Sequence, residues 1–130
     1  MTTERAIERL IEKASGDPDV LAVLLFGSRA RGDSIPGSDT DVCLVLANAS
    51  KQRLEISQKK LAYLVFGDLD VQIFQQLPLY VRQRVLAEGR VLYVKDVGAL
   101  YDVAFRTIRE FEDFRHEYVE YLQMIAHAGS

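Results

Sequence analysis

The segment from Gly27 to Asp41 limits the possible folds of this chain more than any other part. The apolar run at residues 20–26 has the length of a buried strand, and it stops at Gly27. A polar stretch follows, and a second apolar run begins next to Asp39 and Asp41. The pattern predicts two strands joined by a polar loop, with both carboxylates at the start of the second strand.

Both ends of this loop carry groups that suit a metal-bound triphosphate. Ser28 can cap a short helix, so that its hydroxyl and the free backbone N–H groups would face an anion such as a phosphate. Side chains alternate along a strand, and Asp39 and Asp41 therefore share one face. Neighbouring carboxylates repel one another unless a cation lies between them. Mg²⁺ prefers one or two protein carboxylates together with substrate phosphates.

A third carboxylate is available in a later short strand, at about residues 67–74. Its apolar residues alternate onto one face, which leaves Asp68 and Asp70 on the other. We favour Asp70, because Asp68 directly follows the turn residue Gly67 and is expected at the solvated entry to the strand. Three carboxylates could bind two metal ions.

Two other ligand-binding loops do not fit these residues. Gly27 and Gly32 have the glycine spacing of a Walker A loop, but Asp33 and Ser34 follow where Lys and Ser or Thr are required. An EF-hand needs alternating ligands and a terminal Glu at offsets that this loop lacks.

The motif resembles the signature of the nucleotidyltransferase superfamily that includes DNA polymerase β. It consists of Gly27-Ser28, ten intervening residues and Asp39-x-Asp41. Within this superfamily, the chain resembles the minimal, stand-alone branch of MNT antitoxins, which are partners of HEPN ribonuclease toxins. The resemblance extends from the first helix through the aromatic-rich C-terminal helix. It implies that Gly27 and Ser28 bind the triphosphate, that Asp39 and Asp41 hold the metal ions, and that Asp70 is the third carboxylate.

The resemblance further implies an enzyme that transfers AMP from ATP to a tyrosine of a cognate HEPN toxin and so neutralises it. One Mg²⁺ would orient the triphosphate on Asp39 and Asp41, and a second, adding Asp70, would lower the pKa of the acceptor hydroxyl. Arg29 or Arg31 would neutralise phosphate charge, with a slight preference for Arg31, which lies nearer the return of the loop toward the carboxylates.

Two alternative functions stay open at this point. The acceptor could be a small hydroxylated molecule such as an aminoglycoside, although the chain leaves little room for the extra substrate-binding domain that such enzymes usually carry. Alternatively, the protein could be an antitoxin that acts by binding alone, through its C-terminal helix, with an idle or regulatory nucleotide site.

Composition limits the remaining classes. The chain has 130 residues, which suits one domain spanning 1–130. Its formal net charge of −3 argues against a general nucleic-acid binder, which usually has a basic surface. The single Cys43 cannot form an intramolecular disulfide, and we find neither a signal-peptide pattern nor an apolar run approaching the roughly 20 residues that cross a membrane. We therefore expect a cytoplasmic protein with no membrane role.

The element pattern predicts a mixed α/β (α+β) fold with the helices packed largely on one side of the sheet. Thr3 is expected to cap a first helix with an apolar stripe at Ile7, Leu10, Ile11 and Ala14. Further helices are expected at about 51–66 and 78–87, and a last strand at 90–94. In the first of these helices, Leu54, Gln58, Leu61 and Val65 lie at turn spacing.

A long helix is predicted at about residues 97–126. Thirty residues would extend about 45 Å, further than a domain of this size needs. Its main apolar stripe is expected at Leu100, Ala104, Ile108, Phe111, Tyr118, Leu122 and Ile125. Additional aromatic residues lie off that stripe, and we expect the distal end of the helix to meet a partner.

Overall fold

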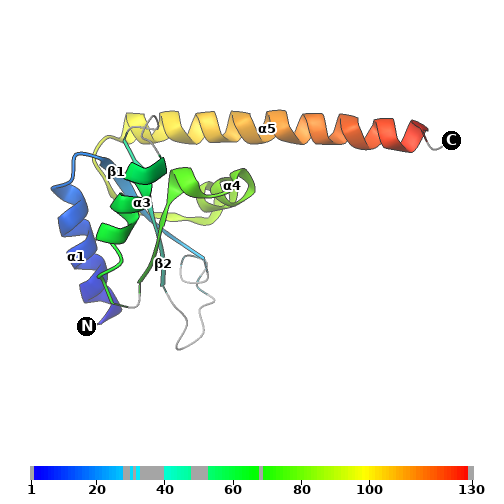
Figure 1. The fold of residues 1–130 in the computed structure, drawn as a ribbon. Coiled ribbons are helices and arrows are strands. Elements are labelled where there is room, and N and C mark those ends of the chain that lie inside the picture. The colour runs from blue at the N-terminus through cyan, green and yellow to red at the C-terminus, as the bar shows by residue number, and fades with distance from the viewer. Residues whose placement is uncertain are drawn as a thin grey trace.

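The computed structural model describes residues 2–27, 30, 32, 40–47, 53–67 and 69–128. In chain order the elements are α1 (Thr3–Ser15), β1 (Val20–Phe26), β2 (Thr40–Leu46), α3 (Arg53–Ala62), β3 (Leu69–Ile73), the 3₁₀ turn η1 (Phe74–Gln76), α4 (Leu79–Glu88), β4 (Arg90–Val94) and α5 (Val97–Ala128). Figure 1 shows α5 lying across one end of a small α/β domain.

The strands form one four-stranded mixed sheet in the order β3-β2-β1-β4. β1 pairs antiparallel with both β2 and β4, whereas β2 and β3 run parallel. This confirms the predicted mixed α/β class. The parallel pairing places the starts of β2 and β3 at the same edge of the sheet, where β1 ends.

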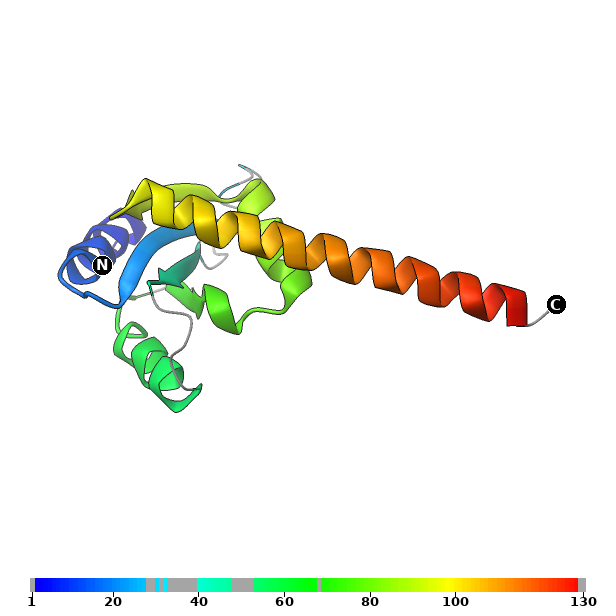
Figure 2. The same cartoon turned by 90° about the horizontal axis from the view of Figure 1, so that it is seen from above.

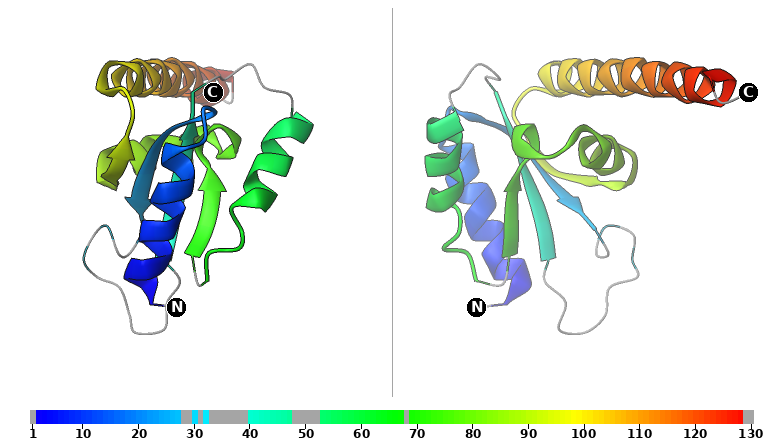
Figure 3. Two further views of the ribbon diagram at one scale, coloured as in Figure 1. Left: turned by 90° about the vertical axis from the view of Figure 1, so that its left-hand side faces the viewer. Right: turned by 45° about the vertical axis from the view of Figure 1, so that its right-hand side comes forward.

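Helices cover both faces of the sheet, which differs from the expectation that they pack largely on one side (Figure 3). α1 and α3 pack on one face, while α4 and the first turns of α5 pack on the other. The physical reason lies in β1, whose residues 20–25 are all buried. A strand that is apolar on both faces needs a covering layer on each side.

The bounds of α4 and α5 follow the predictions closely, whereas α3 ends at Ala62 rather than near residue 66. The buried faces of two helices also differ from the predictions. Thr2 rather than Thr3 caps α1, and its hydroxyl accepts a hydrogen bond from the Arg5 N–H at 3.2 Å. The buried positions of α1 are Ala6, Leu10 and Ala14. Pro78 and Gly89 flank α4 as expected.

In α3, the predicted apolar face is the wrong one. Leu54, Leu61 and Val65 are exposed, whereas Ile56 is buried, together with Tyr63 just after the helix. Periodicity alone could not find this, because the orientation of α3 is set by polar contacts of Lys59 and Tyr63 with a distant loop.

That loop joins α1 to β1, and Asp17 is its central residue. The Asp17 carboxylate accepts hydrogen bonds from Lys59 Nζ and the Tyr63 hydroxyl, both at 2.9 Å, and from the Asp19 N–H at 3.0 Å. Lys59 Nζ also lies 3.1 Å from the Asp19 carboxylate. Burial opposes ionisation of Asp17, but these hydrogen bonds outweigh it and lower the pKa of the carboxyl.

α5 is 32 residues long and begins at Val97, as predicted. Its first part packs against α4 and β1, and the rest extends past the domain (Figure 2). The buried residue of this helix is Thr107, so the stripe in contact with the core passes through Leu100, Val103 and Thr107 rather than through Ile108. Among the described residues, no helix has the length and apolarity that a membrane span requires.

We predict that Asp17→Asn lowers the free energy of unfolding by about 1–3 kcal/mol at neutral pH, because three hydrogen bonds lose a charged acceptor. Since the folded-state pKa of Asp17 is lowered, its contribution is complete above the unfolded pKa of about 3.9 and is lost as pH falls through the folded value. Urea unfolding of both proteins should therefore show a difference that narrows below about pH 4.

Glu8→Gln provides the control, because that side chain is 68% exposed on α1. A difference between wild type and Asp17→Asn that is independent of pH would contradict this account of the Asp17 contacts.

Candidate functional site

Two of the predicted carboxylates meet at the edge where β1 ends and where β2 and β3 begin. Asp41 and Asp70 are register partners in the parallel β2/β3 pair. Neighbouring strands lie about 4.8 Å apart, so the two side chains are adjacent. Asp41 is half-buried and Asp70 is exposed.

Both carboxylates lie on the face of the sheet that α4 and α5 cover. Val42 and Leu44, one and three positions after Asp41 in β2, pack with α1 and α3, as do Leu69 and Val71 on either side of Asp70. Because side chains alternate along a strand, Asp41 and Asp70 project to the opposite face. The sheet therefore directs both carboxylates toward the α4 side.

Gly27 lies directly against Asp41. Its φ of +75° is in the left-handed region, and a Cβ built on it would lie 2.3 Å from Asp41 Oδ2 and 3.2 Å from Asp41 Cγ. Two independent reasons therefore disfavour a side chain at this position: the left-handed backbone conformation and the lack of room beside the Asp41 carboxylate. The turn glycine and the carboxylate of the predicted motif touch in the folded chain.

Asp70 is oriented by a chain of hydrogen bonds that sequence reasoning did not identify. Gln72 Nε2 donates to Asp70 Oδ1 at 3.0 Å, and Lys60 Nζ donates to Gln72 Oε1 at 3.0 Å. Gln72 follows Asp70 by two positions and so shares its strand face, and the sequence could therefore have predicted that the two side chains are neighbours. Lys60 comes from α3, and only the tertiary structure shows that it reaches this site.

The remaining predicted site residues, Ser28, Arg29, Arg31 and Asp39, lie outside the described residues, as does Asp68. Within the described ranges, no group of three or more His, Cys, Asp or Glu side chains is placed to hold a metal ion. The two described carboxylates are hard oxygen donors of the kind that Mg²⁺ prefers, and they fit such an ion.

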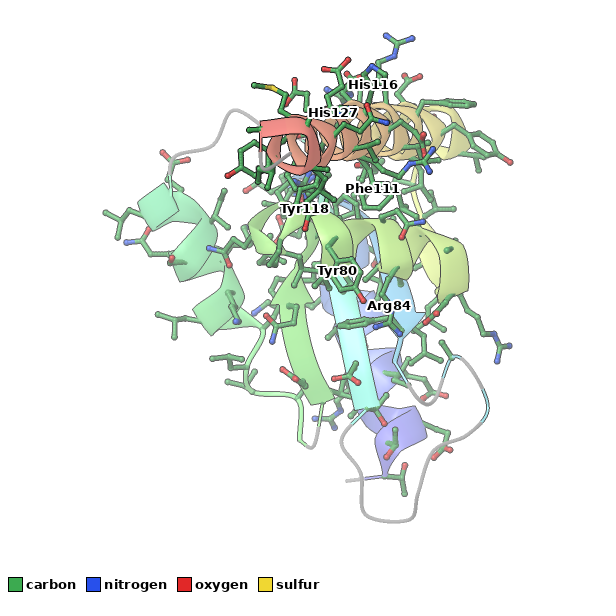
Figure 4. The ribbon with its side chains drawn as sticks, turned by 90° about the vertical axis from the view of Figure 1, so that its right-hand side faces the viewer. Tyr80, Arg84, Phe111, His116, Tyr118 and His127 are labelled. Atoms are coloured by element: carbon green, nitrogen blue, oxygen red, sulfur yellow. The ribbon has the colours of Figure 1, made fainter. Side chains whose placement is uncertain are left out.

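Neither histidine belongs to this site. His116 lies on the exposed part of α5, where its Nε2 is 3.2 Å from Glu120 Oε1. Figure 4 shows His116 on the side of α5 facing away from the domain, opposite Phe111 and Tyr118. Cys43 is fully buried, and burial raises the pKa of its thiol, so it is not a candidate nucleophile.

We predict that Gly27→Ala lowers stability by more than Gly67→Ala. Gly67 also has a left-handed φ, +61°, but a Cβ there would meet its nearest neighbour only at 3.9 Å. Gly67→Ala should therefore carry only the conformational penalty of about 1–2 kcal/mol. Combining Gly27→Ala with Asp41→Ala removes the clashing atoms and should reduce the penalty of Gly27→Ala to a similar value.

This double-mutant cycle is measured by urea unfolding. If Gly27→Ala has the same effect with and without the Asp41 carboxylate, then the close contact does not exist in solution.

Comparison with known proteins identifies the family. The family model described as Polymerase beta, Nucleotidyltransferase matches residues 8–97. Two proteins of Methanocaldococcus jannaschii, both named as candidate protein adenylyltransferases, are 32% identical over 74 residues and 24% identical over 110 residues. These matches cover 57% and 82% of this chain. The chain spans little more than half of the first relative, 56%, and 70% of the second.

Solved structures share the fold over nearly the whole chain. A chain from a toxin–antitoxin structure with AMP-PNP is 23% identical, with a TM-score of 0.66, and the match covers 95% of this chain and 98% of that one. A chain from the complex of the tri-AMPylated HEPN toxin of Shewanella oneidensis with its MNT antitoxin is 19% identical, with a TM-score of 0.61 and 94% coverage of both. The predicted resemblance is confirmed, and the chain belongs to the DNA polymerase β nucleotidyltransferase family.

Proposed function

We propose that this protein is a Mg²⁺-dependent protein adenylyltransferase that acts as an antitoxin. It would transfer AMP from ATP to a tyrosine of a cognate HEPN toxin and thereby neutralise the toxin. The observation that carries the proposal is the pairing of Asp41 with Asp70 on one sheet face, with Gly27 in contact with Asp41. The two relatives named as candidate protein adenylyltransferases support the same reaction class.

In this proposal, Gly27 brings the loop backbone against the carboxylates, and Ser28 binds the triphosphate. Asp39 and Asp41 hold the metal ions, with Asp70 as the third ligand. When bound, Mg²⁺ supplies neutralisation of phosphate charge and a lower pKa for the acceptor hydroxyl. Arg31 or Arg29 adds positive charge beside the β- or γ-phosphate.

The reaction is an in-line displacement at the α-phosphate. The tyrosine oxygen forms the new bond to phosphorus, and the bond from phosphorus to the pyrophosphate oxygen breaks. Asp70 is the candidate to accept the tyrosine proton, because it is the exposed member of the pair. Its Oδ1 accepts the Gln72 hydrogen bond, which orients the carboxylate.

The distal part of α5 supports a protein as the acceptor. Spacings of three and four residues continue the stripe of Leu100, Val103 and Thr107 beyond the domain, onto Phe111, Phe114, Tyr118, Leu122 and Ile125. The last four of these are between 45% and 57% exposed. The rings of Phe114 and Tyr118 stack at 6.2 Å between centroids, which presents a flat aromatic surface. Such anchors are typical of protein interfaces.

The same surface also favours the second candidate function, an antitoxin that neutralises by binding alone. In that case the carboxylates would be dispensable for neutralisation, and the α5 stripe would be essential. Transfer to a small hydroxylated molecule has no comparable support among the described residues.

We predict that Asp41→Asn and Asp70→Asn each abolish AMP transfer, because each removes one ligand charge while nearly preserving side-chain volume. The purified protein is incubated with ATP, Mg²⁺ and the product of the neighbouring gene, and that product is weighed by intact-mass spectrometry. We expect the mass of the partner to increase by AMP groups that map to tyrosine. This increase should persist with the control variant Glu8→Gln and disappear with both site variants. Normal transfer by a folded Asp41→Asn protein would reject the site.

We predict that Leu122→Glu combined with Ile125→Glu weakens binding of the partner but changes the free energy of unfolding by less than about 0.5 kcal/mol, because both positions are solvent-exposed. Met124→Glu is the matched control, since Met124 is 70% exposed but lies off the stripe. Isothermal titration with the partner measures both variants. Equal affinity for the two would remove the stripe from the interface.

A further inference from the structure

The amide of Gln72 bridges two charged side chains of opposite sign. Its Nε2 donates to Asp70 Oδ1 at 3.0 Å, and its Oε1 accepts a hydrogen bond from Lys60 Nζ, also at 3.0 Å. Asp70 is exposed, whereas Gln72 and Lys60 are half-buried. The proposed function relies on Asp70 and assigns no role to Lys60.

Lys60 reaches Gln72 around the edge of the sheet. Among the described strands, β3 pairs with β2 alone and is therefore an edge strand. Gln72 is the register partner of Cys43, whose side chain belongs to the buried cluster on the α4 side. α3, which carries Lys60, packs on the opposite face. A side chain of α3 that contacts Gln72 must pass the edge of β3, and the four-carbon stem of lysine is long enough to do so.

The neighbouring lysine fixes the orientation of α3. Lys59 Nζ lies 2.9 Å from the Asp17 carboxylate and 3.1 Å from the Asp19 carboxylate. Consecutive residues of an α-helix are about 100° apart around its axis. Holding Lys59 at the loop before β1 therefore also determines the direction in which Lys60 leaves the helix. Contacts outside the candidate site thus present Lys60 to the edge of β3.

Lys60 decides which end of the Gln72 amide faces Asp70. A lysine ammonium can only donate hydrogen bonds and an ionised carboxylate can only accept them, whereas an amide does both. The opposite orientation would put the amide NH₂ group against the ammonium and the amide oxygen against the carboxylate, and both contacts would be repulsive. A hydrogen bond from a charged donor also polarises the amide, which strengthens the donation from Nε2 to Asp70.

This arrangement restricts an exposed carboxylate that would otherwise rotate. An aspartate side chain at the surface samples several rotamers, and a metal ion that binds it must select among them. The hydrogen bond from Gln72 holds Asp70 before any ion binds. Removing an outer partner of a metal ligand typically costs roughly 10- to 100-fold in metal affinity or activity.

We infer that Lys60 and Gln72 are positioning residues for the metal site. Gln72 holds Asp70 in the orientation that binds Mg²⁺, and Lys60 acts through Gln72 by fixing its amide. This inference rests on the proposed function, because it takes Asp70 as a metal ligand. It extends the site from the carboxylates onto α3, a helix on the other face of the sheet, and it requires that the contribution of Lys60 disappear once Gln72 has lost its amide.

Metal binding, measured apart from AMP transfer, provides the test. Mn²⁺ is the probe, and free Mn²⁺ is counted by electron paramagnetic resonance in mixtures of the full chain with AMP-PNP, with AMP-PNP alone as the blank. Gln72→Leu and Lys60→Met should each weaken Mn²⁺ binding by about tenfold, and the double variant should be no weaker than Gln72→Leu. Lys60→Arg should stay within about twofold of the wild type, because a guanidinium can also donate to Gln72 Oε1.

Gln58→Met is the matched control, since Gln58 is an exposed residue of the same helix, and urea unfolding checks that each variant folds. If Asp70→Asn weakens Mn²⁺ binding but Gln72→Leu does not, the positioning role is wrong and the proposed function stands. Additive losses in the double variant, or equal affinities of Lys60→Met and Lys60→Arg, would show that Lys60 does not act through Gln72. The second comparison keeps the test decisive even if Gln72→Leu does not fold.

One outcome would overturn the proposed function as well. If the wild type binds no more Mn²⁺ than AMP-PNP alone, or if Asp70→Asn binds Mn²⁺ as tightly as the wild type, Asp70 is not a metal ligand. The proposed site then fails, and this inference fails with it.

Discussion

The burial of β1 on both faces is the constraint on which the rest of the structure depends. Residues 20–25 are all buried, so this strand needs a neighbour on each edge and a helical layer on each side. α1 and α3 supply one layer, and α4 with the start of α5 supplies the other. The candidate site lies at the end of this central strand, where β2 and β3 begin.

The site combines paired strand ends with a contact that only glycine permits. Parallel pairing puts Asp41 and Asp70 side by side, and Gly27 leaves space for the Asp41 carboxylate. Gln72 and Lys60 complete the arrangement by orienting Asp70 from the edge strand and from α3.

α5 shows how one helix can serve two purposes with one stripe. Leu100, Val103 and Thr107 belong to the folded domain, and the same spacing continues onto Phe114, Tyr118 and Leu122, which are exposed. The pattern predicted the helix and its length almost to the residue. It did not show where the domain ends beneath the helix, because periodicity is identical for a face that meets a core and one that meets a partner.

The sequence by itself determined the mixed α/β class, the order of the elements and the family, because these depend on local apolar runs, turn residues and fixed spacing. It predicted Leu54, Leu61 and Val65 as one helical face, although all three are exposed and Val65 lies beyond the end of α3, and it placed the helices on one side of the sheet. Only the tertiary structure decided which face of α3 is buried and which helices cover each face of the sheet. The reason is that both depend on residues far apart in the chain, such as Asp17 in contact with Lys59 and Tyr63. For the same reason, the contact of Gly27 with Asp41 and the hydrogen bond from Lys60 to Gln72 become visible only in the folded protein.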